Sequence, residues 1–195
     1  MEILDHPKLP LYLLLTFSIL VFGVIISFYI NPPSISQNFS FINSPVYTMT
    51  SFDIFTSVFV KNLLATFLII SLSILGIRLI PILCIIANGY MIGYTISLLN
   101  YNASIVFATI FPHGYFEFPI LLFTGACSLI IVDEIKKTRL NAYTLLTKHG
   151  NPHVRYVFKN YLLYPYILII IPGVFITAVI ESTFSLWNLR ILLGG

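Results

Sequence analysis

Charged side chains are scarce in this sequence. Only 9% of its 195 residues are Asp, Glu, Lys or Arg, and 58% are hydrophobic, whereas a soluble globular domain has about 25% charged residues. This composition excludes a soluble domain with a charged surface, and we predict an integral membrane protein with little mass outside the lipid bilayer. The formal net charge of +3 is too small to indicate nucleic acid as a partner.

Cysteine and the familiar catalytic motifs are also missing or rare. The two cysteines, Cys84 and Cys127, lie in apolar runs, where we expect them to pack as small hydrophobic residues. The sequence has no Gly-x-Ser-x-Gly, no phosphate-binding loop and no His-Glu-x-x-His. We therefore expect a protein that is not an enzyme and that carries no cofactor.

Long apolar runs are abundant, and they predict an all-α membrane helix bundle. A helix needs about 20 apolar residues to cross a bilayer. We predict five transmembrane helices in a single domain, residues 1–195, at about 11–30, 62–80, 82–99, 115–132 and 161–180. The apolar stretch 103–111 is too short to cross, so we predict a re-entrant or interfacial half-helix that ends at Pro112 and Gly114.

The segments between and after the spans have different characters. Residues 34–56 contain no Lys or Arg, and we expect an outer loop there. Residues 133–159 form a basic loop with six Lys or Arg, into which the fourth helix is expected to continue as far as about Lys148. We expect a kink at Pro172 and an aromatic tail, 184–190, along the outer interface.

The distribution of positive charge predicts the orientation of the chain in the membrane. Cytoplasmic loops carry an excess of Lys and Arg. With five crossings, Lys8, Arg78 and the six basic residues of the 133–159 loop fall on one side, and only Lys61 and Arg190 fall on the other. We therefore predict a multi-pass protein of the cell membrane with its N-terminus in the cytoplasm.

A small set of polar residues within the apolar runs is the candidate functional site. His113 and Glu117 are one helical turn apart, so their side chains can share a helix face. With the predicted topology, Glu181 and Asn62 reach the same depth near the outer face, and Asn88 is a mid-span amide that needs a partner across the bundle. Ionisable groups at membrane depth cost about 2.5–3.5 kcal/mol each and need partners.

Three hypotheses compete for this polar cluster. In the first it is structural: Glu117 complements a helix N-terminus, and His113 bonds to Glu117 or Glu181. In the second, one histidine and two carboxylates hold a divalent metal, although a second histidine within the spans is missing. In the third, a broken helix and inward carboxylates form a transport pathway, with His113 able to carry protons near neutral pH.

The pair Gly89 and Gly93 has the Gly-x-x-x-Gly spacing that lets another helix backbone come close. We expect these glycines to serve helix packing rather than a binding site.

Together these motifs resemble the stage II sporulation protein M family. The similarity covers about residues 55–185. It is carried by Asn62, Asn88-Gly89 with Gly93, Pro112-His113-Gly114 with Glu117, Gly125-Ala126, and Ile176-Thr177-Ala178-Val179-Ile180-Glu181. One departure is Phe118-Pro119-Ile120, which stand where the family usually has a small residue, and which are expected to bend the start of the fourth span differently.

This resemblance implies a polytopic membrane protein with no established enzymatic activity. In endospore formers the family member is a membrane scaffold for a peptidoglycan-remodelling complex, whose partners include a lytic transglycosylase and an amidase. The leading expectation is therefore a non-enzymatic scaffold, surrounded by the lipid bilayer and assembled as a homo-oligomer or with envelope proteins. The alternative is a small transporter or channel-like protein built around His113, Glu117 and Glu181.

Overall fold

The structure is a computed structural model, and it describes residues 3–30, 50–98, 103–137, 156 and 158–192, with only the backbone described at 98, 103–116 and 185–192. These residues form helices and no strand. Five helices are long and apolar enough to cross a membrane. The prediction of an all-helical membrane bundle with five spans is therefore confirmed.

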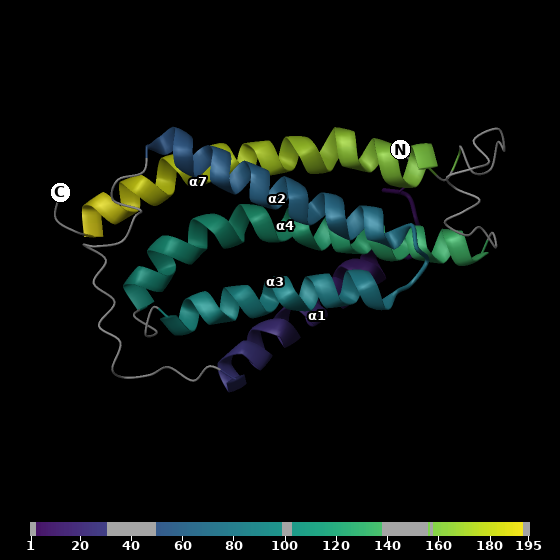
Figure 1. The fold of residues 1–195 in the computed structure, drawn as a ribbon, viewed down its shortest axis with the longest axis horizontal. Helices are drawn as coiled ribbons and strands as arrows, with labels where there is room; N and C mark the ends of the chain where they lie inside the picture. Colours follow the sequence, from purple (N-terminus) through teal and green to yellow (C-terminus); the bar gives the residue numbers. More distant parts are fainter. Residues whose placement is uncertain (1–2, 31–49, 99–102, 138–155, 157, 193–195) are drawn as a thin grey trace.

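The helices are α1 (Leu9–Ile30), α2 (Ser51–Ser73), α3 (Leu79–Leu98), α4 (Ala103–Lys137) and α7 (Ile171–Leu192), with the π-helical turns η3 (Phe158–Leu163) and η4 (Tyr166–Ile170) leading into α7. Successive helices run in opposite directions along the bundle (Figure 1). The start of α1, the α2–α3 turn and the end of α4 therefore lie together at one end. The starts of α2 and α4 lie together at the other.

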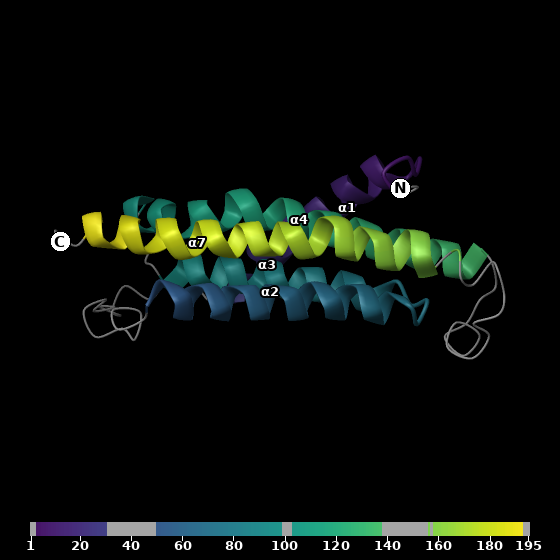
Figure 2. The ribbon, with the colours of Figure 1, turned by 90° about the horizontal axis from the view of Figure 1, so that it is seen from above.

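Helix α4 is the central element of the bundle. It contacts α1, α2, α3 and α7, and 61% of the residues in its span are buried, against 17% to 28% in the other spans. Every residue from Thr124 to Val132 is buried. Figure 2 shows α2 and α3 on the same side of α4.

Helices α1 and α3 pack closely through small residues. A Cβ atom added at Gly89 would lie 2.2 Å from the carbonyl oxygen of Leu20, and one added at Gly93 would lie 2.7 Å from that of Val24. Gly23 of α1 is equally restricted, since its added Cβ would lie 2.4 Å from the oxygen of Ile86. The expected packing role of Gly89 and Gly93 is confirmed, because backbone meets backbone at both.

Helix α2 packs against α7 through aromatic rings. The ring of Phe175 lies edge-on to Phe55, with 5.6 Å between ring centroids, and edge-on to Phe59, at 6.0 Å. Such geometry is the favourable one for aromatic pairs. Before α7 the chain makes wider π-type turns around Pro165, consistent with a proline that cannot donate a backbone hydrogen bond. The kink at Pro172 stays a prediction.

The separate half-helix at 103–111 is a prediction that the structure corrects. These residues form the first turns of α4, which continues through Pro112 and Gly114 to Lys137, although its first turns run at an angle to the rest (Figure 1). Proline breaks soluble helices, but helices in a membrane bundle tolerate it where neighbouring groups satisfy the freed carbonyl. The predicted extension of α4 to Lys148 lies outside the described residues.

Two helix ends are also corrected. Helix α2 begins at Ser51, well inside the expected outer loop, because Thr50 and Asp53 form a capping box: Thr50 accepts from the Asp53 N–H, and Asp53 accepts from the Thr50 N–H. Helix α7 continues to Leu192, so residues 184–190 are part of a helix and not a separate tail. Their position along the outer interface stays a prediction. In both cases helical geometry extends past the apolar run.

Candidate functional site

A cavity of about 270 Å³ lies within the bundle and is lined by residues of α2, α3, α4 and α7. Its polar lining residues are Asn62, Thr66, Asn88, Thr95, Glu117 and Thr177, and the other lining residues are apolar. Among the lining residues, which all belong to the described part of the chain, none is basic. The cavity therefore collects three of the five predicted site residues: Asn62, Asn88 and Glu117.

Asn62 and Glu117 are joined directly. The side-chain amide of Asn62 on α2 donates a hydrogen bond to Oε1 of Glu117 on α4. Asn62 does not open its helix as predicted: it stands eleven positions after Ser51, about 16 Å along the axis. The pair therefore lies well inside the bundle rather than near its outer face.

The hydroxyl groups of the cavity are engaged with their own helices. Thr66 donates to the carbonyl oxygen of Asn62 at 2.9 Å, Thr95 to that of Met91 at 2.9 Å, and Thr177 to that of Gly173 at 2.8 Å. Each hydroxyl has one hydrogen, so its oxygen remains as an acceptor towards the cavity.

Asn88, which was predicted to bond across the bundle, bonds within its own helix. Its amide nitrogen donates to the carbonyl oxygen of Cys84 at 2.8 Å, on the same helix, instead of bonding across the bundle. The amide nitrogens of Asn62 and Asn88 are thus both directed at oxygen atoms. The lining is predominantly accepting, and the Glu117 carboxyl group can add a negative charge.

Glu181 lies one helical turn after Thr177 on α7, so the two residues share one side of this helix. Thr177 lines the cavity. Glu181 is only 3% exposed. An added Cβ at Gly173 would meet Ile120 of α4 at 2.3 Å, so this part of α7 packs against the α4 turn that follows Glu117. Thr177 and Glu181 come one and two turns later, and Thr177 lines the cavity whereas Glu181 does not.

The side chain of His113 lies outside the described residues, so its predicted bond to Glu117 or Glu181 stays a prediction. Its backbone is part of continuous α4. The described side chains include no group of three His, Cys, Asp or Glu that could hold a metal ion. The metal hypothesis, which needs His113, therefore also stays a prediction.

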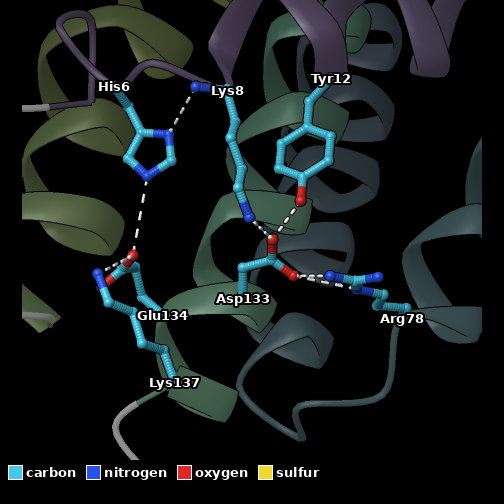
Figure 3. Close-up of polar contacts among 7 residues, drawn as sticks. All are labelled: His6, Lys8, Tyr12, Arg78, Asp133, Glu134 and Lys137. Atoms are coloured by element: carbon cyan, nitrogen blue, oxygen red, sulfur yellow. Dashed lines mark hydrogen bonds and ion pairs between the residues drawn. The ribbon is translucent and has the colours of Figure 1, made fainter.

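A second polar cluster, at the opposite end of the bundle, is centred on Asp133 of α4 (Figure 3). The carboxylate accepts from the Lys8 ammonium at 2.9 Å, from the Tyr12 hydroxyl, and from two nitrogens of the Arg78 guanidinium. These donors come from the segment before α1, from α1, and from the α2–α3 turn. Asp133 is 9% exposed, so one buried carboxylate joins three parts of the chain.

The Asp133 carboxylate stabilises the charged forms of Lys8 and Arg78. The hydrogen bond to Asp133 raises the pKa of Lys8 and of Arg78 above their ordinary values, so both stay charged at neutral pH. Beside them, His6 Nε2 lies 3.7 Å from Oε1 of Glu134, and Lys137 lies 3.7 Å from the same oxygen. The N-terminal segment is thereby attached to the end of α4.

The role of Asp133 is not predicted from the sequence, in which this residue simply follows the fourth predicted span, 115–132. The available signal was its position, a carboxylate at a helix end with Arg78 and Lys8 at other span ends on the same side. From the sequence alone, these cations indicate only the orientation of the chain.

The polar positions and the five-span architecture fit one family. The family model of stage II sporulation protein M matches residues 12–186. The chain belongs to the stage II sporulation protein M family. Neither a curated protein nor a solved structure shows a significant match.

The match to the stage II sporulation protein M family is longer than the predicted core of 55–185, because it begins within α1. Helix α1 is the closest neighbour of α3, and its Tyr12 contacts Asp133. The family region of this chain thus includes both polar sites, the cavity at Glu117 and the cluster at Asp133, apart from Lys8 and His6.

Proposed function

We propose that this stage II sporulation protein M family member is a non-enzymatic membrane scaffold that assembles with envelope-active proteins. The observation that carries the proposal is the use of the polar side chains as ties between helices. Asn62 joins α2 to Glu117, Asp133 joins α4 to α1 and to Arg78, and Tyr166 donates to the carbonyl oxygen of Leu63 at 3.2 Å. A scaffold needs a rigid body that presents fixed surfaces.

Small residues support the same reading. Apolar surface does not drive helix association inside lipid, so close packing and interhelical polar bonds hold such bundles together. Gly23, Gly89 and Gly93 allow backbone contact between α1 and α3. Large apolar side chains on the outer faces, such as Phe22, Phe67 and Phe184, then face lipid or the spans of partner proteins.

The proposed orientation places the Asp133 end in the cytoplasm. Lys8, Arg78, Lys136 and Lys137 belong to this end, in keeping with the excess of Lys and Arg on cytoplasmic sides. The opposite end, with the start of α2, would face the compartment in which envelope-active enzymes work.

Site-specific photo-crosslinking tests the scaffold. A photoreactive phenylalanine analogue replaces Phe22, Phe67 or Phe184, one at a time, in the native membrane. We expect a discrete product with an envelope protein from one or two of these positions and lipid adducts alone from the others. Lipid adducts alone from all three positions would contradict the proposal.

Transport is the second candidate function, and the cavity beside Glu117 is the observation that favours it. Ionisable side chains that face a cavity within the spans often mark a substrate or ion pathway, whereas the broken helix expected from the sequence is absent at Pro112, where α4 is continuous. If the cavity is a transport site, purified protein in liposomes would show a substrate flux that Glu117→Gln abolishes. Flux without any crosslinked protein would favour transport over the scaffold.

A further inference from the structure

Lys61 is a charged residue in an unexpected place. It precedes Asn62 in the interior of α2 and is exposed, beside the exposed Val60 and Leu64. Among the described residues it has no hydrogen bond or ion pair. A lysine on the lipid-facing surface of a span needs an acidic or accepting partner, and here this partner must come from outside the described bundle.

The cavity offers the complementary chemistry at the same depth. Asn62 bonds to Glu117, so Lys61 differs from the level of that pair by one residue of α2, about 1.5 Å. The cavity collects a carboxyl group, two amide oxygens and three threonine oxygens. This lining matches an ammonium group, which has three donors and no acceptor.

The cavity is bordered by the outer surface on the α2–α3 side. Met91, which lines it, is 58% exposed, and Thr95 is exposed as well. Lys61 lies on the edge of α2 next to this side, because it stands one turn before Ala65, another lining residue. The donor and the opening therefore belong to one face of the molecule.

We propose that two copies of this chain pair through the α2–α3 face, with the Lys61 ammonium of each copy entering the cavity of the other and binding the Glu117 carboxylate. A two-fold axis along the membrane normal keeps equivalent residues at equal depth, so Lys61 of one copy meets the level of the cavity of the other. The same rotation places α2 of each copy opposite α3 of the other, so Lys61 crosses the edge formed by Met91 and Thr95. Such an interface is self-complementary.

This inference rests on the proposed scaffold function and names its first partner, a second copy. It is tested with two full-length chains that carry different affinity tags and are co-expressed in a host without the native envelope partners. One tag is captured, and the second is quantified after mild detergent extraction. Failure here leaves the crosslinking test for envelope partners in native membranes unaffected.

Four combinations of copies distinguish ion pairing from general damage. When both copies carry Lys61→Met, or both carry Glu117→Gln, both intermolecular ion pairs are lost, and we expect capture to fall at least about five-fold from wild type. When one copy carries Lys61→Met and the other Glu117→Gln, one complete pair survives and no charge is left unmatched. We expect this mixed combination to recover at least half of the wild-type capture.

The mixed combination is its own folding control, because it contains the same two variants as the matched ones. Equal capture from all combinations would overturn the proposal, and so would a mixed combination no better than the matched ones, or wild-type chains that do not capture each other. A further outcome would also overturn the proposal: methylammonium stabilises the Lys61→Met protein, and two Lys61→Met copies capture each other as well as wild type. The cavity would then be a site for free amines.

Cysteine crosslinking gives an independent measurement of the same contact. In a background with Cys84→Ser and Cys127→Ala, one copy carries Lys61→Cys and the other Met91→Cys. We expect a disulfide-linked dimer from this combination and much less from Lys61→Cys with Leu168→Cys, an exposed position on η4. Equal yields from both combinations would contradict the α2–α3 interface.

Discussion

The amide of Asn62 bonds to the carboxyl group of Glu117 in the interior of the bundle, across 55 positions of sequence. Asn62 is half-buried in the middle of α2, and Glu117 is half-buried on the central helix α4. The contact joins two spans at the edge of a polar cavity. It gives the Glu117 carboxyl group the partner that an ionisable group at membrane depth needs.

The Asp133 cluster should be the strongest polar contribution to stability. Breaking a fully buried ion pair costs about 3–5 kcal/mol. The side chains of Lys8 and Arg78 are about half-exposed, so we expect Asp133→Ala to lower the free energy of unfolding by about 2 kcal/mol. Thermal unfolding in detergent measures this loss, with Lys136→Gln, at an exposed position of the same helix end, as the control. A control variant as unstable as Asp133→Ala would argue against a special role for Asp133.

The Lys8 contact should depend on pH in the alkaline range. Its bond to Asp133 raises the pKa of Lys8 above the ordinary 10.5, so its contribution is fully present at neutral pH and is lost as the pH rises through the folded-state pKa. We expect Lys8→Met to lower the melting temperature at pH 7 and to match wild type once the pH exceeds that pKa. If the difference in melting temperature between wild type and Lys8→Met does not shrink as the pH rises, the packing of the Lys8 side chain, and not its charge, stabilises the protein.

The α1–α3 contact should not accept a larger residue at Gly89. An added Cβ meets the Leu20 carbonyl oxygen at 2.2 Å, and overpacking typically costs about 1–3 kcal/mol. We expect Gly89→Leu to lower the melting temperature clearly, whereas Ala87→Leu, at an exposed position of the same helix, should leave it unchanged. Similar melting temperatures for the two variants would show that α1 and α3 are not in close contact.

The orientation can be tested from outside the cell. In a background with Cys84→Ser and Cys127→Ala, cysteine replaces Ser51 or Asp5, both exposed, at opposite ends of the bundle. A membrane-impermeant maleimide on intact cells should label position 51 and not position 5, because the N-terminus is proposed to be cytoplasmic. Labelling of position 5 alone would require the opposite orientation.

The sequence predicts the membrane bundle well because lipid imposes a strict rule on composition. All five apolar runs become helices, and Gly89 and Gly93 pack as expected. Helix ends are harder to predict: the capping box at Thr50 extends α2 beyond its apolar run, and Pro112 does not end α4. Sequence patterns describe one helix at a time, whereas contacts with neighbouring helices decide whether a residue such as Pro112 ends its helix.

The polar site is predicted only in part for the same reason. Asn62, Asn88 and Glu117 reach one cavity, but the partner of Asn88 is a carbonyl of its own helix. Asp133 looks like an ordinary span end until Lys8, Tyr12 and Arg78 are brought to it from other segments. The register between helices decides such contacts, and a single sequence does not contain it.

A double-mutant cycle on Asn62 and Glu117 tests the central claim, that polar residues of the spans hold the helices together, most directly. The free energy of unfolding is measured for wild type, Asn62→Ala, Glu117→Ala and the double variant. Interhelical hydrogen bonds in membrane proteins contribute about 0.6–2 kcal/mol, so we predict a coupling energy of about 1 kcal/mol, with the double variant less destabilised than the sum of the singles. Additivity of the two single losses would contradict the claim.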